Sequence, residues 1–230
     1  MRLQQTLAYE YEKENIAYWT NRAPGYSEVN RQELRSGQRG VWGRTLAEAI
    51  ADHYPGRKRQ DIAVLDIGTG PGFFAIILAE MGFAVTAVDY TDSMLDKARA
   101  NAGKWRDQIC FRKMNAEELT FAPESFDVIV SRNLTWNLHD PKKAYQSWER
   151  VLKSGGLLLN FDANWYRYLY DEKAMEGYRR DRENIKAAGV ANETDGTDIP
   201  AMEAIAGKAP LSAVCRPGWD IDVLEGLGMS

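Results

Sequence analysis

Short apolar runs recur along the middle of the chain, and the stretches between several of them have helical spacing. The runs predict five strands, at Ile62–Ile67, Ala84–Asp89, Ile109–Lys113, Phe126–Ser131 and Gly156–Phe161. Strands that are apolar over their whole length are typical of parallel sheets covered on both faces. The pattern therefore predicts an α/β fold with a doubly wound, mainly parallel sheet.

Helix signals fill the intervals between the strands. Asp140 and Pro141 read as an N-cap followed by proline at the first helical position, which predicts a helix to about Val151 that Gly155-Gly156 stops. Further segments are predicted as a first helix at Phe73–Met81, a charged helix at Glu172–Ala188, a loop at Ala191–Pro200 and a last helix at Asp220–Leu227.

The composition indicates a single domain. The 230 residues are 44% hydrophobic and contain no repeat, which suits one sizeable α/β domain with additions. We expect one domain over residues 1–230, with N-terminal helices over 1–54, a core over 60–162 and a helical cap over 163–218.

Charge and cysteine content exclude several classes of protein. The net charge of −4, without a long Lys/Arg cluster, disfavours nucleic acids and acidic membranes as partners, so a small molecule is expected. The polar start and the lack of a long apolar stretch predict a cytoplasmic protein with no membrane span. Two separate cysteines, Cys110 and Cys215, support neither a disulfide framework nor a metal site.

A glycine-rich turn follows the first predicted strand. Gly68, Gly70 and Gly72 alternate there, so the backbone can pass close under a ligand, and the next helix points its positive N-terminus at the turn. Asp89 ends the second strand, about where an acid accepts hydrogen bonds from ribose hydroxyls. These positions predict a nucleoside ligand with a free ribose.

The residues beside the turn indicate which nucleoside ligand is expected. Phe73 stands where the dinucleotide pattern G-x-G-x-x-G needs its third glycine, which weakens the case for NAD. Asp66 is expected at the mouth of the turn, where its charge would repel a diphosphate and attract a sulfonium or ammonium group. S-adenosylmethionine meets these requirements. Alternatively, Asp66 caps the turn and Asp89 caps the helix that begins near Asp92.

Four motifs follow one another between about Ile62 and Phe161. They read D-I-G-T-G-P-G, V-T-A-V-D-Y-T-D-S-M-L, N-A-E-E-L with S-F-D-V-I-V, and V-L-K-S-G-G-L-L-L. In this order they resemble the class I S-adenosylmethionine-dependent methyltransferases, especially small-molecule enzymes like those of quinone biosynthesis. The resemblance implies a Rossmann-like sheet and S-adenosylmethionine as cofactor.

The resemblance also implies roles for residues along the motifs. The glycines would underlie the methionine moiety, Asp89 would hold the ribose, and residues after the second and third strands would surround adenine. Asn115 stands where the family often has Asp, but its amide carbonyl can still accept a hydrogen bond from the adenine amino group. The predicted cofactor set is Asp66, Gly68, Thr69, Gly70, Gly72, Phe73, Asp89, Tyr90, Met94, Asn115, Ala116, Glu117, Ser131 and Arg132.

Two segments outside the motifs are candidates for choosing the methyl acceptor. One is an aromatic and basic cluster around a predicted turn at Pro24-Gly25, and the other is the aromatic run Trp165–Tyr170 in the cap. The candidate acceptor residues are Trp19, Arg22, Tyr26, Trp165 and Tyr168. Packing of these aromatic side chains against the domain is the alternative.

Methyl transfer needs mainly alignment, because the sulfonium is already activated and the acceptor approaches in line with the departing sulfur. A general base is optional. His139, one of two histidines, follows the fourth strand and is a candidate for that role, with an ordinary loop residue as the alternative.

Other functions and one departure from the family are also considered. An NAD-dependent oxidoreductase and an inactive S-adenosylmethionine-binding protein are the alternatives to a methyltransferase. Class I methyltransferases usually add an antiparallel strand pair after the fifth strand, and no such pair is predicted here. Either the chain is part of a longer protein or the fifth strand is left as an unprotected edge.

We expect the protein to bind S-adenosylmethionine and its demethylated product, but not NAD, in calorimetric titrations. D89A should weaken this binding by about tenfold or more, because hydrogen bonds to a charged acceptor contribute about 1.5–3 kcal/mol each. Unchanged affinity in D89A would contradict the assignment of Asp89 to the ribose.

Overall fold

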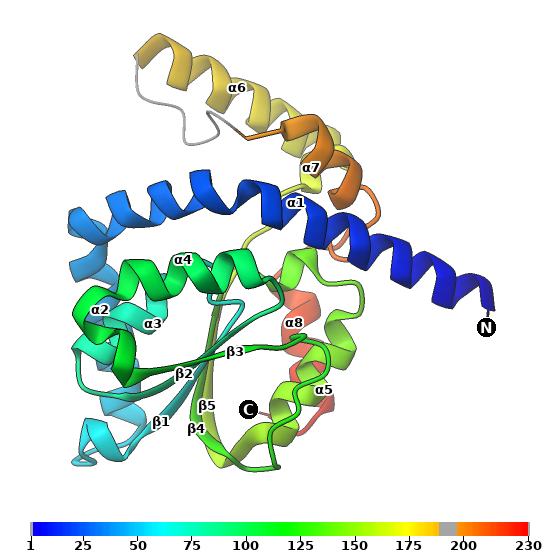
Figure 1. Ribbon diagram of the computed structural model, residues 1–230. Helices are drawn as coiled ribbons and strands as arrows, with labels where there is room; N and C mark the ends of the chain where they lie inside the picture. Colours follow the sequence, from blue (N-terminus) through cyan, green and yellow to red (C-terminus); the bar gives the residue numbers. More distant parts are fainter. Residues whose placement is uncertain (1, 189–196, 230) are drawn as a thin grey trace.

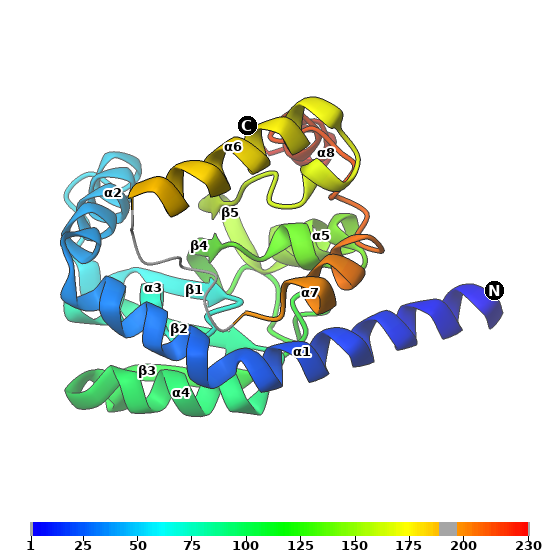
Figure 2. The ribbon, with the colours of Figure 1, turned by 90° about the horizontal axis from the view of Figure 1, so that it is seen from above.

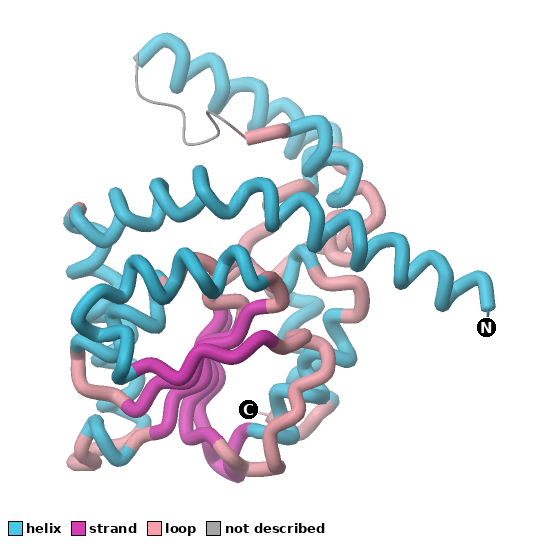
Figure 3. The backbone as a smooth tube through the Cα atoms, in the orientation of Figure 1, coloured by secondary structure: helices cyan, strands magenta, loops and turns pink. Residues whose placement is uncertain are grey.

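The core is a five-stranded parallel sheet with helices on both faces. A computed structural model describes residues 2–188 and 197–229. The strands are β1 Ala63–Ile67, β2 Ala84–Asp89, β3 Ile109–Lys113, β4 Phe126–Arg132 and β5 Leu152–Phe161. Their order in the sheet is β3-β2-β1-β4-β5, and every neighbouring pair is parallel. Figure 3 shows the strands gathered in one sheet with helices around it. The predicted doubly wound sheet is confirmed.

Helices connect and cover the strands. The α-helices are α1 Arg2–Arg35, α2 Gly37–His53, α3 Phe73–Glu80, α4 Asp92–Ala102, α5 Pro141–Val151, α6 Glu172–Ala188, α7 Ile199–Ala206 and α8 Gly218–Gly226. Short 3-10 turns are η1 Arg59–Asp61, η2 Gly103–Gln108, η3 Thr135–Asn137 and η4 Arg167–Leu169. No described helix is both long enough and apolar enough to cross a membrane.

The layers place the carboxyl ends of the strands under α1. Side chains of α2, α3 and α4 pack on one face of the sheet, while α5 and α8 pack on the other. Helix α1 runs beside α4 along the edge of the sheet, and α6 and α7 lie beyond it (Figures 1 and 2). This arrangement leaves space for a ligand between α1 and the strand ends.

The boundary between α5 and β5 differs from the prediction. Asp140 caps α5 and Pro141 is its first residue, as expected, and the helix ends at Val151. However, β5 begins at Leu152, so Gly155 and Gly156 lie inside the strand and do not stop the helix. The physical reason is pairing, because Leu152 pairs with Phe126 before a register shift in the ladder.

The predicted turn at Pro24-Gly25 is also wrong, since both residues lie inside α1. An internal proline normally costs a helix about 3 kcal/mol or more. Here the surrounding contacts compensate, because Ala23 is fully buried and Ser27 exchanges hydrogen bonds with Asn101 of α4. Tertiary packing therefore overrides the local signal.

Beyond β5 the described residues form helices joined by turns. The predicted helices at Glu172–Ala188 and near Asp220–Leu227 are confirmed as α6 and α8. The predicted loop over 191–200 lies mostly outside the described residues, and its end, Ile199-Pro200, opens α7. In residues 162–188 and 197–229 no strand joins the sheet, so β5 is the edge there, as predicted.

A buried arginine fastens the end of the cap to the sheet. The Arg216 guanidinium donates to both carboxylate oxygens of Asp220 in α8, at 2.7 and 2.6 Å. Its Nη1 lies 2.9 Å from Oδ2 of Asp162, just after β5, and its Nη2 donates to the Thr135 hydroxyl at 2.5 Å. One side chain thus joins three segments that are distant in the sequence.

R216A should lower the free energy of unfolding by about 3–5 kcal/mol, because it leaves the buried carboxylates of Asp162 and Asp220 without a counter-charge. The matched control is R167A, whose ion pair with Asp171 is partly exposed and should contribute about 1 kcal/mol or less. Urea denaturation measures both variants. Equal losses would show that the buried network is not a special source of stability.

Candidate functional site

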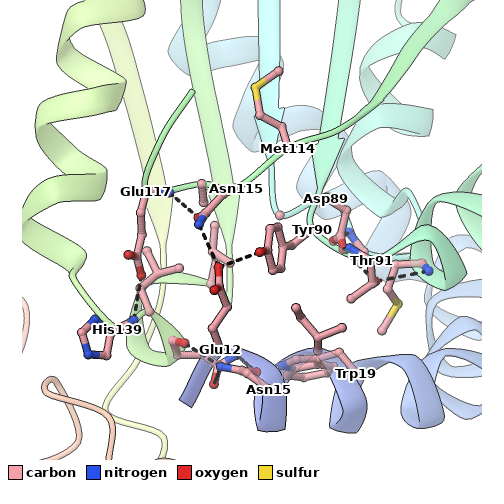
Figure 4. A pocket seen from close by; sticks show the side chains of 18 of the residues that line it. Glu12, Asn15, Trp19, Asp89, Tyr90, Thr91, Met114, Asn115, Glu117 and His139 are labelled. Atoms are coloured by element: carbon pink, nitrogen blue, oxygen red, sulfur yellow. Dashed lines mark hydrogen bonds between the residues drawn. The ribbon is translucent and has the colours of Figure 1, made fainter. Parts of the chain in front are cut away.

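A cavity of about 440 Å³ lies between α1 and the carboxyl ends of β1, β2, β3 and β4 (Figure 4). It lies where ligands bind in open α/β sheets, at the point where the strand order reverses. The predicted cofactor residues that line it are Gly68, Gly70, Asp89, Tyr90, Met94, Asn115, Ala116, Glu117 and Arg132. The other predicted residues, Asp66, Thr69, Gly72, Phe73 and Ser131, are buried behind this lining.

The glycine turn brings the backbone and the start of α3 under the cavity. Gly72 is the N-cap of α3 with a φ of +94°, a left-handed conformation that favours glycine. A Cβ at this position would lie 3.1 Å from the Cβ of Ala98 in α4. Gly72 therefore acts through close packing of α3 on α4, which aims the positive end of α3 at the turn.

Asp66 lies beneath the turn, so the prediction that it stands at the mouth is wrong. Its side chain is buried, and Oδ2 accepts hydrogen bonds from the Thr69 hydroxyl at 2.7 Å and the Ala75 N–H at 3.0 Å. Burial raises the pKa of Asp66 to about 7. The alternative role, in which Asp66 holds the turn, fits this geometry.

Asp89 faces the cavity and also holds the turn. One carboxylate oxygen accepts from the Gly70 N–H at 2.9 Å, and the other accepts from the N–H and hydroxyl of Thr91, each at 2.9 Å. Burial raises the pKa of Asp89. The cap of α4 is Thr91, which accepts from the Met94 N–H, so Asp89 supports that cap and does not form it.

Polar groups after β2 and β3 form the opposite end of the cavity. Asn115 turns its amide oxygen to the Glu117 N–H at 2.9 Å, so one of the two lone pairs of this oxygen is already used. The Glu117 carboxylate accepts from the N–H groups of His139 and Asp140 at 2.8 and 3.0 Å. Glu117 thereby connects this wall to the exposed loop that carries His139.

The residues at the end of β4 divide between cavity and core. The Ser131 hydroxyl is fully buried and donates to the Ile67 carbonyl at 3.1 Å, so it ties β4 to β1. Arg132 lines the cavity, but its guanidinium pairs with Glu33 at 2.6 Å and lies 4.6 Å from the centre of the Phe73 ring. The Phe73 ring therefore packs against the guanidinium of Arg132.

The structure separates the five acceptor candidates. Trp19 and Tyr26 of α1 line the cavity, and the Tyr26 ring lies against the turn at Gly70. Arg22 borders a separate depression between α1 and α7. In the cap, Trp165 is 49% exposed, and the Tyr168 hydroxyl donates to Glu203 at 2.7 Å. Only the first two are brought together with the cofactor positions.

Sequence reasoning missed several cavity residues on α1. Tyr11, Glu12 and Asn15 line the cavity together with Trp19. Tyr11, Asn15 and Trp19 are spaced by four positions, which puts them on one face of a helix. That spacing could have indicated a shared helix face in the sequence, but it does not show which part of the protein this face contacts. His139 also lines the cavity, at its exposed rim, 5.7 Å from the Tyr11 ring.

Comparisons with known proteins agree with this fold. Residues 65–160 match the family model described as "Methyltransferase domain". A ubiquinone biosynthesis O-methyltransferase of Coxiella burnetii is 32% identical over 109 residues, covering 46% of this chain and 47% of the relative. A demethylmenaquinone methyltransferase of Renibacterium salmoninarum is 32% identical over 146 residues, covering 64% and 57%. The chain spans about half the length of these curated relatives.

A solved structure shares the fold over more of the chain. A candidate S-adenosyl-L-methionine-dependent methyltransferase from Methanococcus maripaludis superposes with a TM-score of 0.52 at 22% identity, covering 78% of this chain and 82% of that one. The family match, the ordered motifs and the strand order agree. Residues 65–160 thus match the methyltransferase-domain family, and the sheet has the Rossmann-like strand order of the class I fold.

The raised pKa of Asp66 predicts a pH dependence of stability. The unfolded carboxyl ionises near pH 4, whereas the folded one stays protonated to about pH 7. Relative to D66N, the wild-type free energy of unfolding should therefore fall between about pH 4 and 7 and level off above. D66N is a suitable reference because its amide oxygen can accept both hydrogen bonds that now reach Oδ2. Parallel denaturation curves would contradict the buried, protonated carboxyl.

Proposed function

We propose that this protein transfers the methyl group of S-adenosylmethionine to a small-molecule acceptor. The observation that carries the proposal is the cavity at the strand ends, where Asp89 and the turn at Gly70 meet beneath α1. An acceptor carboxylate for ribose hydroxyls, a helix N-terminus and a wall of polar and aromatic groups suit the parts of this cofactor.

When bound, S-adenosylmethionine supplies an activated methyl group on a sulfonium. The protein then contributes alignment. Asp89 would hold the ribose, and the turn backbone would lie under the methionine moiety. Tyr90 and Met94 would flank the adenine ring. Helix α1 roofs the cavity and limits the access of water. His139 lies at the rim, where it can exchange a proton with solvent, so we retain it as a candidate base.

The acceptor class is part of the same proposal. The names of two relatives refer to ubiquinone biosynthesis and to demethylmenaquinone, and the net charge of −4 disfavours nucleic acid. We propose a small acceptor, a cytoplasmic location and a single functional unit in which the N-terminal helices and the cap close the core. Incorporation of labelled methyl from S-adenosylmethionine into a metabolite extract tests activity and separates an enzyme from an inactive binding protein.

W19A and Y26A should lower turnover while leaving the affinity for S-adenosylhomocysteine within about threefold, because both rings line the cavity outside the motif residues. W165A is the matched control, since Trp165 is half exposed and does not line the cavity. Labelled-methyl transfer and calorimetry measure the two quantities. A loss of stability with full turnover in the folded fraction would identify Trp19 and Tyr26 as packing residues.

A further inference from the structure

Helix α1 inserts a carboxylate into the cavity from outside the matched methyltransferase motifs. Glu12 projects toward the ends of β2 and β3 (Figure 4), and its Oε1 accepts from the Tyr90 hydroxyl at 2.6 Å and from the Asn115 amide at 3.3 Å. Tyr90 and Asn115 are 78 and 103 positions away in the sequence. Glu12 therefore reaches the end of the cavity proposed for adenine.

The position of Glu12 is fixed from the other wall as well. The Tyr11 hydroxyl donates to the Asn137 carbonyl at 3.1 Å, and the Asn15 amide donates to the same carbonyl and to the Asn137 side-chain oxygen, each at 3.1 Å. These bonds join α1 to the loop after β4, whereas Glu12 joins it to β2 and β3. The helix that carries Glu12 is therefore held from two sides, and its carboxylate is held by Tyr90 and Asn115, so it is ordered before a ligand binds, which lowers the entropy cost of using it.

The neighbouring polar groups leave Glu12 as an acceptor for a ligand. Asn115 uses its amide oxygen on the Glu117 N–H and its amide nitrogen on Glu12. Glu117 accepts the backbone N–H groups of His139 and Asp140, both through its Oε1. Among the described residues, Glu12 makes hydrogen bonds through Oε1, and none reaches its Oε2. That oxygen faces no competing donor.

Building on the proposed cofactor, we propose that Glu12 recognises the 6-amino group of its adenine ring. Oε2 accepts the exocyclic N–H, while Tyr90 and Asn115 hold Oε1. A carboxylate accepts hydrogen bonds without donating them, so it matches an amino group and opposes the 6-oxo group of hypoxanthine. Glu12 would thus select adenosyl over inosyl ligands, a specificity contributed by the N-terminal helix.

Calorimetry with two stable ligands tests this role without catalysis. S-Adenosylhomocysteine has an amino group at the purine 6-position. S-Inosylhomocysteine has an oxo group there and a proton on the neighbouring ring nitrogen. The wild-type protein should prefer the adenosyl ligand by about tenfold or more, as expected for one hydrogen bond to a charged acceptor. In E12Q the amide can donate to the 6-oxo group, so the preference should fall to about threefold or less. E12A should also lose the preference for the adenosyl ligand.

E14Q is the matched control on the same helix. Glu14 is exposed and pairs with Lys208 at 2.5 Å, away from the cavity, so its substitution should leave the ratio of affinities unchanged. Circular dichroism establishes that each variant is folded, and E12Q keeps the size of the side chain if E12A does not fold.

The outcomes test the role of Glu12 separately from the assignment of S-adenosylmethionine as the cofactor. A wild-type ratio retained in both E12Q and E12A overturns the role of Glu12 while leaving the proposed function intact. Collapse of the ratio in E117Q, but not in E12Q, assigns the amino group to Glu117 and also overturns it. Failure of the wild-type protein to bind either ligand overturns the proposed function and this inference together.

Discussion

The buried carboxylate of Asp66 joins the end of β1, the glycine turn and the first helix of the core. Both of its hydrogen bonds reach one oxygen, from the Thr69 hydroxyl and the Ala75 N–H. These donors offset part of the cost of burying an acid, and the pKa of about 7 reflects the remainder. The turn is thereby held where the Gly70 N–H meets Asp89. The placement proposed above for the cofactor depends on the position of this turn.

The roof of the site has a different origin from its floor. The floor comes from the motif segments of the sheet, which match the methyltransferase family over residues 65–160. The roof is α1, which lies outside that match and is fixed to Asn137 on one side and to Tyr90 on the other. Since the cavity exists only between the two, its ligand must satisfy both the shared core and the chain's own N-terminal helix.

The cap contributes packing more than a wall for the acceptor. The Tyr168 ring stacks on Tyr178 with ring centres 4.1 Å apart, and its hydroxyl donates a hydrogen bond to Glu203. The polar group of Tyr168 therefore already has a partner within the cap. Arg216 then ties the end of the cap to Asp220 in α8 and to Asp162 just after β5. Two aromatic residues there were candidates for contacts with the acceptor. Tyr168 has its partners within the cap, because a buried hydroxyl needs a nearby acceptor, whereas Trp165 donates to Asp162 just after β5.

Sequence alone determined the features that depend on short-range signals: the five strands, the Asp140-Pro141 start of α5, the glycine turn and the helices α6 and α8. Burial depth and long-range partners were decided by the tertiary structure. Packing kept Pro24 inside a helix, strand pairing drew Leu152 into β5, and folding of β1 against its neighbours buried Asp66. Glu12 gave no local signal, because its partners lie 78 and 103 positions away and meet it only when α1 crosses the strand ends.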